Sequence, residues 1–317
     1  MIKGKEGDTM NELQTITTAL TAENPIIDRY INSLDVKPKT KEAYKKALRQ
    51  FFKWQEETQR QQIDRADILE YKAFLMANYS ASTVSAYMTA VRGLFTWLEA
   101  EKLYPNIAAG IKGAKAAKGF RKDTLTPLQA KSVLSHIDRS KVEQLRDYAI
   151  INLLLRTGLR TIEAQRANIE DIRQQAGQCL LYIQGKGRDS KDAFVILTPA
   201  TLEPIQAYLT ARGRADQSAP LFASHGNRSK GERLTTRSIS RIAKEALKAA
   251  GIDSDRITAH SLRHTAITFS LLGGATIQEA QQLARHSNIN TTLIYAHNID
   301  RINRAPETRL DSYLDSF

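Results

Sequence analysis

Residues 179–197 read CLLYIQGKGRDSKDAFVIL, and they decide the fold class because the rest of the chain shows mostly helical patterns. Two apolar runs, Cys179–Ile183 and Ala193–Leu197, flank a polar loop that contains Gly185 and Gly187. Such a pair of β-prone runs around a glycine-containing loop is typical of an antiparallel hairpin. The sequence therefore predicts a mainly α-helical protein with one small antiparallel β-sheet.

Helical patterns surround this hairpin on both sides. Thr126-Pro127 is a helix start with proline at the first helical position, and Thr198-Pro199 is another. Residues Lys141 to Arg156 are apolar enough for a buried helix. The remaining helices are predicted at about Thr236 to Ala250, at Ser261 to Leu272, at Ile277 to Ala284, and after Pro306.

The N-terminal third predicts a separate unit of four helices that ends near Tyr104-Pro105. A short helix covers Pro25 to Leu34, and Thr40, Asp64 and Ser82 are candidate caps for the next three. Apolar residues recur at three- and four-residue spacing after each cap, for example Tyr44, Leu48, Phe51 and Phe52. We interpret these aromatic residues as core rather than as platforms for stacking bases.

These patterns predict the domain organisation. We expect a flexible leader over residues 1–22, a helical domain over 23–110, a basic linker over 111–123 and a mixed α/β domain over 124–317. The linker is rich in alanine and glycine and carries five basic residues before its first acid, Asp123. It is either a solvated tether or a strap along a phosphate backbone, and its basic residues are Lys112, Lys115, Lys118, Arg121 and Lys122.

Composition narrows the class of protein. The 317 residues include 46 Lys+Arg and 34 Asp+Glu, a formal net charge of +12 that favours a polyanionic partner. A single cysteine, Cys179, excludes a disulfide framework and any cysteine-rich zinc module. No apolar run reaches the ~20 residues of a membrane span, and the N-terminus has no signal-peptide pattern. We expect a soluble intracellular protein without a membrane partner.

Four clusters in the predicted α/β domain carry chemically active side chains. Arg160 and Glu163 lie three apart after Gly158, so the carboxylate can hold the guanidinium, although a plain surface ion pair has the same pattern. Lys186 lies between two glycines at the hairpin tip, where a lysine usually serves only solubility. These two clusters are weak signals when each is taken alone.

The other two clusters contain histidines. His260, Arg263 and His264 share one face of a helix start, and the arginine favours an oxyanion over a metal ion. We interpret His264 as a structural, hydrogen-bonded histidine. His286 and Tyr295 are nine residues apart, so the turn at Ser287-Asn288 is needed to bring them together before a short helix that ends around Tyr295.

Together the four clusters contain what in-line attack on a phosphodiester requires without a metal. Two arginines can neutralise the non-bridging oxygens while a hydroxyl attacks. A histidine can take the proton of the nucleophile, and a lysine can donate one to the leaving oxygen. Clustered carboxylates, which two-metal nucleases need, are missing from the sequence.

In these residues the sequence resembles the tyrosine recombinases, the phage-integrase and Xer-like family. Four short motifs occur in the order of that family, and the resemblance covers nearly the whole chain from about Pro25. They are TGLRTIEA at 157–164, GKG at 185–187, HSLRHT at 260–265, and His286 followed by Tyr295. One departure is Ala284-Arg285 before His286, where the family more often has Leu-Gly.

The resemblance implies a role for each motif residue. Tyr295 would attack the scissile phosphate and join its 3′ end, leaving a 5′ hydroxyl, without ATP, a metal or another cofactor. The other implied roles are phosphate clamping by Arg160 and Arg263, positioning of Arg160 by Glu163, general-acid catalysis by Lys186, proton acceptance by His260, and a hydrogen bond from His286 to a non-bridging oxygen.

The resemblance also implies partners. The helical and catalytic domains would form a C-shaped clamp around double-stranded DNA with inverted-repeat core sites. Four copies would exchange strands through a Holliday junction, in the cytoplasm at the bacterial nucleoid, and accessory DNA-bending proteins are a further partner class. The C-terminal tail would dock on a neighbouring subunit, with apolar residues at three- and four-residue spacing: Leu310, Tyr313, Leu314 and Phe317. From the short leader before Pro25 we expect a simpler recombinase without an arm-site domain.

Three other functions share some of these features. Residues Thr276 through Tyr295 could form the helix-turn-helix of a DNA-binding regulator, but that function leaves Lys186 and the two arginine motifs unexplained. A type IB topoisomerase would use the same chemistry on one duplex. A relative that binds DNA without cutting it is disfavoured, because every catalytic residue type is present. The sequence leaves open the target site and the choice between integration or excision, dimer resolution and inversion.

Overall fold

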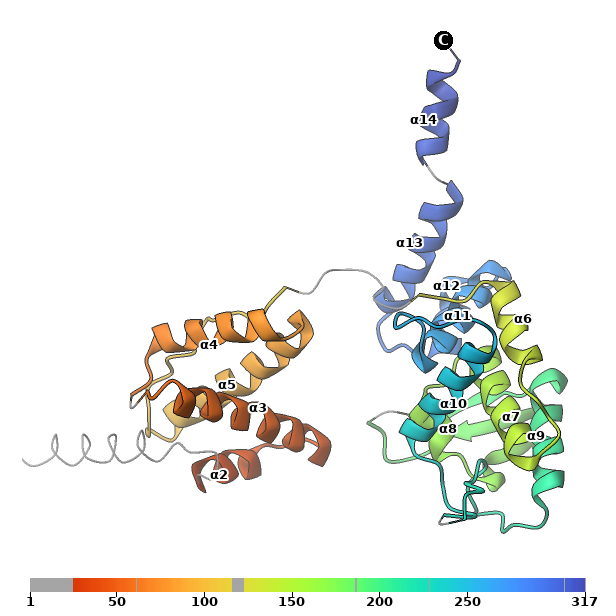
Figure 1. Ribbon diagram of the computed structural model, residues 1–317, viewed down its shortest axis with the longest axis horizontal. Coiled ribbons are helices and arrows are strands. Elements are labelled where there is room, and N and C mark those ends of the chain that lie inside the picture. Colours follow the sequence, from red (N-terminus) through yellow and green to blue (C-terminus); the bar gives the residue numbers. More distant parts are fainter. Residues whose placement is uncertain are drawn as a thin grey trace, which may run out of the picture. The chain divides into compact units, whose positions relative to one another are not determined.

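The structure is a computed structural model that describes residues 25–60, 62–115, 123–185, 187–227, 229–304 and 306–316. The predicted leader and five predicted functional residues lie outside these ranges: Lys118, Arg121, Lys122, Lys186 and the tail residue Phe317. The chain divides into two compact units, residues 1–118 and 119–317 (Figure 1). Each unit is described by itself.

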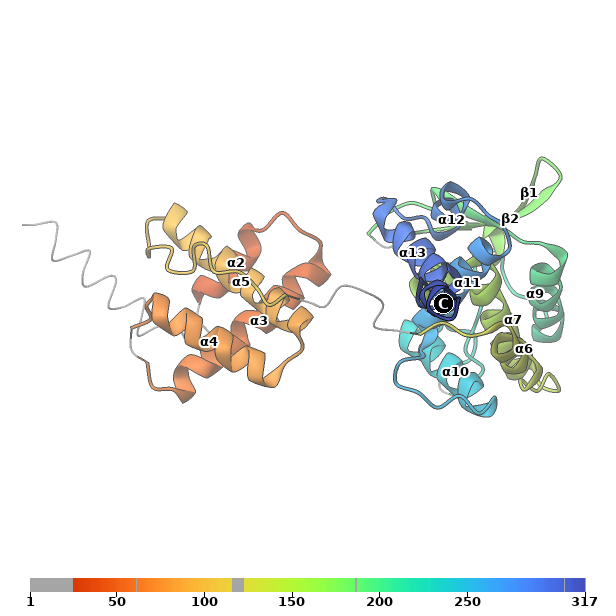
Figure 2. The same ribbon diagram turned by 90° about the horizontal axis from the view of Figure 1, so that it is seen from above.

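The described part of the first unit consists of four helices, as the sequence predicts: α2 (Pro25–Ser33), α3 (Pro38–Glu57), α4 (Arg65–Asn78) and α5 (Ala81–Ala100) (Figures 1 and 2). Its aromatic residues form the core. Phe51, Phe52 and Tyr71 are fully buried, and the ring centroids of Phe51 and Tyr71 lie 4.9 Å apart at 70°. The interpretation of these rings as core is therefore confirmed.

The helix starts of this unit confirm one predicted cap and correct two. The Asp64 side chain accepts from the Asp67 N–H, and the Asp67 carboxylate accepts in return from the Asp64 N–H. Ser80 caps α5 in place of Ser82. Helix α3 begins earlier than the predicted cap Thr40, because Lys37 is extended and Pro38 takes the first turn.

The beginning of the predicted linker packs on α5. Ile111 is 4% exposed and belongs to the core of the first unit. The Ser85 hydroxyl donates to the Ala114 carbonyl at 2.8 Å, and a Cβ at Gly113 would lie 2.9 Å from Ser85 Cα. The glycine is required for this close approach. Lys112 and Lys115 therefore lie on a segment that is held against the helical unit.

The second unit contains the predicted sheet with one strand more than expected. Strands β1 (Ile172–Gln175), β2 (Gln178–Ile183) and β3 (Ala193–Ile196) are antiparallel in the order β1-β2-β3. Leu181 pairs with Ile172 on one side and with Val195 on the other. The sequence Ile-Arg-Gln-Gln of β1 lacks the apolar alternation of a strand, because three of its four residues are exposed.

Helices make up most of the second unit. Helix α7 (Val142–Thr157) is buried along most of its length and packs on α9 and α11, so it is the central support of the unit. The order of the other helical segments is α6 (Pro127–Ser135), α8 (Thr161–Arg166), the 3₁₀ turn η1 (Ile169–Asp171), α9 (Pro199–Arg212), α10 (Thr236–Ala249), α11 (Ala259–Leu272) and α12 (Ile277–Ala284). Each predicted helix of this domain is present.

Two helices follow α12. Helix α13 (Asn290–Arg304) packs against α11 and α12, and it continues nine residues beyond Tyr295, where its end was expected. Helix α14 (Pro306–Leu314) lies beyond it (Figure 1). Its apolar residues Leu310, Tyr313 and Leu314 are 56–64% exposed. Within the described residues, the structure contains no helix long and apolar enough to cross a membrane.

Candidate active site

Gly158 ends α7 and lets the chain turn into the site. Its φ of +61° is in the left-handed region that glycine adopts without a steric penalty. The chain then reaches Arg160, which precedes α8. Glu163, in the first turn of α8, is 0% exposed, and its Oε1 accepts from Arg160 Nη1 at 2.9 Å. The sequence-predicted pair is therefore formed, and it is a buried carboxylate holding a guanidinium rather than a surface ion pair.

Arg263 is held by the backbone at two points. Its Nη1 donates to the carbonyl of Gly158 and its Nη2 to the carbonyl of Ala284. The residue is 2% exposed, on the buried face of α11. Burial and the guanidiniums of Arg160 and Arg285 lower the pKa of Arg263 to about 9, so it is charged at neutral pH. A fixed planar cation of this kind is suited to a phosphate oxygen.

Tyr295 is buried in the second unit, beside two histidines. Its hydroxyl is hydrogen-bonded to His264 Nδ1, and its ring stacks on that of His286 with centroids 6.3 Å apart. His286 Nδ1 is in turn hydrogen-bonded to Thr292 Oγ1 at 3.0 Å. The turn between α12 and α13 brings these side chains together, as the sequence required. His264 is hydrogen-bonded inside the domain, as predicted, but its partner is the candidate nucleophile.

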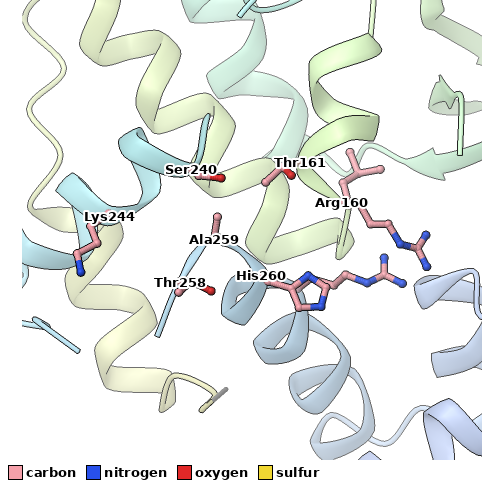
Figure 3. Close-up of a pocket in the computed structure, with 9 residues that line it drawn as sticks. Arg160, Thr161, Ser240, Lys244, Thr258, Ala259 and His260 are labelled. Carbon is pink, nitrogen blue, oxygen red and sulfur yellow. The ribbon is translucent and has the colours of Figure 1, made fainter. Parts of the chain in front are cut away.

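These residues surround two adjoining cavities. One has a volume of about 330 Å³ and is lined by the arginines, the histidines and Tyr295: Arg160, His260, Arg263, His264, Arg285, His286, Ser287, Thr291 and Tyr295. The other, of about 320 Å³, shares Arg160, His260 and Arg263 and extends to Lys244 on α10. In Figure 3 the Arg160 side chain and the His260 ring reach into the same space, with Lys244 at the far end.

The comparisons with known proteins agree with this geometry. Residues 123–301, more than half of the chain, match the model of the phage integrase family, and residues 27–102 match the phage integrase N-terminal SAM-like domain. The chain belongs to the phage integrase family. It is a tyrosine site-specific recombinase, which breaks and rejoins DNA strands.

Individual relatives cover most of the chain. It is 28% identical to tyrosine recombinase XerD of Vibrio cholerae serotype O1 over 295 residues, 89% of this chain and 94% of that one. The fold is similar to that of a XerH site-specific recombinase bound to palindromic difH substrate (TM-score 0.70, 22% identity, 84% of this chain and 78% of that chain). It is also similar to a lambda integrase tetramer bound to a Holliday junction (TM-score 0.65, 19% identity, 85% and 76%). The topoisomerase and regulator alternatives are not favoured.

The structure of the recombinase brings five of the six predicted catalytic residues into one cavity. They are Arg160, His260, Arg263, His286 and Tyr295; Lys186 lies outside the described residues, between β2 and β3. Sequence reasoning missed Arg285 as part of the site. Its only signal was the replacement of the usual glycine before His286.

Arg285 keeps the backbone conformation that a glycine would supply. It follows α12 with φ +52° and ψ +47°, in the left-handed region, and costs about 1–2 kcal/mol more there than a glycine would. The left-handed conformation is therefore adopted here by an arginine, at the position where the family more often has glycine. The guanidinium of Arg285 donates to Glu163 Oε2 at 2.9 Å.

Burial and neighbouring charges shift the pKa values of Glu163 and Tyr295. Burial alone would raise the pKa of Glu163, but Arg285 and Arg160 outweigh it, so the pKa lies below its ordinary value. Burial raises the pKa of Tyr295 to about 12, against the opposing effect of Arg263 and Arg160. The Tyr295 hydroxyl is thus protonated in the unliganded protein, and attack requires a group that accepts its proton.

Acidification is expected to destabilise the catalytic unit through His264 and His286. Burial, followed by neighbouring cations and imidazoles, lowers the pKa of each to about 4, whereas an unfolded histidine has a pKa of about 6.5. Between these values the unfolded chain binds more protons, so stability rises with pH from about 4 to 6.5 and is lost as the pH falls through that window.

The contribution of one histidine can be isolated by His264→Gln. Because solvent reaches part of the His264 ring, its effect on stability is smaller than its full pKa shift would give. We expect His264 to contribute about 1 kcal/mol to the loss of unfolding free energy on acidification, or about 2–4 °C in Tm. Thermal unfolding of wild type and His264→Gln at pH 7 and pH 4.5 measures it. The wild-type protein should lose more Tm on acidification than the variant, and equal losses would contradict the assignment.

Proposed function

We propose that Tyr295 is the nucleophile of the recombinase and that it forms a 3′-phosphotyrosyl bond with the cleaved strand. The phenolic oxygen attacks the scissile phosphorus, and the bond from phosphorus to the 5′ oxygen breaks. A 5′ hydroxyl is released, and its later attack on the phosphotyrosine rejoins the DNA. The convergence of Tyr295 with two anchored arginines, Arg160 and Arg263, in one cavity is the observation that supports this proposal.

Arg160 and Arg263 are the proposed phosphate clamp. Both line the cavity, and each is positioned before DNA arrives: Arg160 by Glu163 and Arg263 by the carbonyls of Gly158 and Ala284. Prepositioned cations stabilise charge that develops on the non-bridging oxygens without reorganisation during the reaction. His286, in the same cavity, would donate to one of these oxygens.

Two histidines divide the handling of the tyrosine proton in this proposal. His264 holds the hydroxyl in the DNA-free protein, since Tyr295 is hydrogen-bonded to its Nδ1. The His260 ring lies against the His264 ring, with centroids 4.6 Å apart. His260 is our proposed acceptor of the Tyr295 proton once DNA is bound. Burial, Arg263 and Arg160 lower the pKa of His260, so it is neutral and able to accept a proton at pH 7.

Lys186 is the proposed general acid toward the 5′ oxygen. Its neighbours support this placement, because Gly187 has a φ of +81° and the Gly185 carbonyl accepts from Arg166 Nη1 at 3.2 Å. Arg166 is in α8, the helix that begins beside Arg160. The hairpin is thereby tied to the helix that directly follows Arg160, one of the two clamp residues.

The recombinase would act as a homotetramer on two DNA sites with inverted repeats. We propose that residues 23–110 and 124–317 clamp the duplex, that 111–123 is a basic strap, and that exchange proceeds through a Holliday junction in the cytoplasm. The lambda integrase tetramer bound to such a junction supports the assembly. The exposed Leu310, Tyr313 and Leu314 on α14 would dock on the next subunit.

A suicide substrate tests the proposed reaction. Duplexes that the protein selects from a random pool are nicked near the cleavage site, so that the 5′-hydroxyl fragment diffuses away and the covalent complex accumulates. We expect an adduct on a denaturing gel that resists EDTA and is linked to the 3′ end. An adduct that requires magnesium, or DNA binding without an adduct, would overturn the proposal. Relaxation of supercoils on DNA without a specific site would favour a topoisomerase.

Neutralising the strap is expected to weaken DNA binding on all sequences alike. Removal of one cation that pairs with a phosphate should reduce the slope of log K against log salt by about 0.9. The test is the salt dependence of binding after replacement of all five basic residues by glutamine: Lys112, Lys115, Lys118, Arg121 and Lys122. Lys248→Gln is the control, because this lysine already pairs with Asp253 at 3.3 Å. An unchanged slope would mean that the segment is only a tether.

A further inference from the structure

Arg285 has an unusual combination of backbone and environment. Four described non-glycine residues have positive φ: Gln59, Lys102, Ala176 and Arg285. The first three are exposed, whereas the Arg285 side chain is only 15% exposed. A glycine would adopt this conformation without strain, so the arginine is useful here only through what its side chain contacts.

The Arg285 side chain joins three segments of the site. Its Nη2 donates to Glu163 Oε2 at 2.9 Å and to the Gly158 carbonyl at 3.3 Å. Its Nη1 donates to the Leu283 carbonyl at 2.7 Å, at the end of α12. One guanidinium therefore connects the end of α7 and the start of α8 with the turn that leads to His286.

Glu163 is shared between two arginines. Its Oε1 accepts from Arg160, and its Oε2 accepts from Arg285 and from the Arg160 N–H at 2.8 Å. The carboxylate is fully buried, so the loss of either partner leaves it with unmet hydrogen-bonding capacity. The position of Arg160 in the cavity consequently depends on Arg285, 122 residues further along the chain from Glu163 but bonded to the same carboxylate.

We propose that Arg285 is a positioning residue for the cleavage step, which fixes Arg160 and the His286 turn relative to each other through Glu163. The inference rests on the proposed function. It assigns Arg285 no contact with the scissile phosphate. It requires that the loss of the guanidinium slow the chemical step while the affinity for DNA stays unchanged.

The test is single-turnover adduct formation on a suicide duplex at saturating protein, for wild type, Arg285→Gly and Arg285→Lys. In Arg285→Gly we expect the Arg160 guanidinium to be displaced by up to about 1 Å. Adduct formation should then be about 10- to 100-fold slower than in wild type, with an unchanged Kd for DNA. Lysine keeps the charge but not the planar fork, so Arg285→Lys should restore part of the rate. Ala176→Gly relieves a left-handed residue in the exposed β1–β2 turn and is the matched backbone control, with a wild-type rate expected.

A double-mutant cycle with Glu163→Gln separates positioning from a general loss of structure. The two substitutions should be strongly non-additive, so that Arg285→Gly slows Glu163→Gln less than about 3-fold. Independent multiplicative effects, or a wild-type rate for Arg285→Gly, would overturn the positioning role alone. A wild-type protein that forms no adduct would overturn the proposed function, and the positioning role with it. Unfolding of the same four proteins reports independently whether the two side chains interact.

Discussion

Replacement of Tyr295 by phenylalanine is expected to eliminate the covalent protein–DNA adduct. The substitution removes only the hydroxyl, which is hydrogen-bonded to His264, and leaves the ring stacked on His286. Removal of a nucleophile from an assembled site commonly costs about 10⁴-fold or more, so adduct formation should fall below detection. Binding of the duplex should persist, because the ring and the arginines stay in place.

The adduct assay on a denaturing gel checks this outcome, with Tyr313→Phe as the control. Tyr313 is in α14, 64% exposed, and is the next tyrosine after Tyr295. Its loss should leave the amount of adduct per bound duplex unchanged. An adduct that survives Tyr295→Phe would show that another side chain attacks the DNA.

Replacement of Arg263 by alanine should have the second largest effect. The residue is 2% exposed and its guanidinium is anchored on two carbonyls at the edge of the cavity. Loss of one preorganised charge stabiliser costs about 10²- to 10³-fold in rate. Most of the DNA affinity should remain, since it comes from the many backbone contacts of a protein with a net charge of +12.

Single-turnover cleavage and the Kd for the same duplex separate the two effects. Arg173→Ala removes an equal charge from the exposed strand β1 and should change neither the rate nor the Kd by more than about 2-fold. Arg263→Lys gives a folded variant with the charge retained, for which a rate loss is still expected because one ammonium cannot replace the planar fork. A wild-type rate for both Arg263 variants would contradict the clamp.

Local sequence signals predicted most of the helices because their determinants are close in sequence. The capping box at Thr126 and Gln129 and the glycine at position 158 are readable without the fold. Strand β1 was not, because its residues are polar and its stability comes from pairing with β2. The end of α13 was also missed, because no proline or glycine interrupts the chain between Tyr295 and Arg304.

The site was predictable as a set of residue types but not as a network. The motif around His260 predicted that His260 and His264 share one face of a helix. The structure confirms this, since their rings lie 4.6 Å apart. The contact between Tyr295 and His264 spans 31 residues, and that between Arg285 and Glu163 spans 122. No periodicity or spacing rule reaches such pairs; they depend on the packing of α11 on α7 and of α12 and α13 on α11.

The most direct test of the proposed mechanism is the identity of the atom that joins the protein to DNA. The covalent complex from a suicide duplex can be digested with protease and nuclease and the remaining nucleotide-bearing peptide sequenced by mass spectrometry. We expect a nucleotide attached through its 3′ phosphate to Tyr295. Attachment to any other residue, or through a 5′ phosphate, would contradict the mechanism.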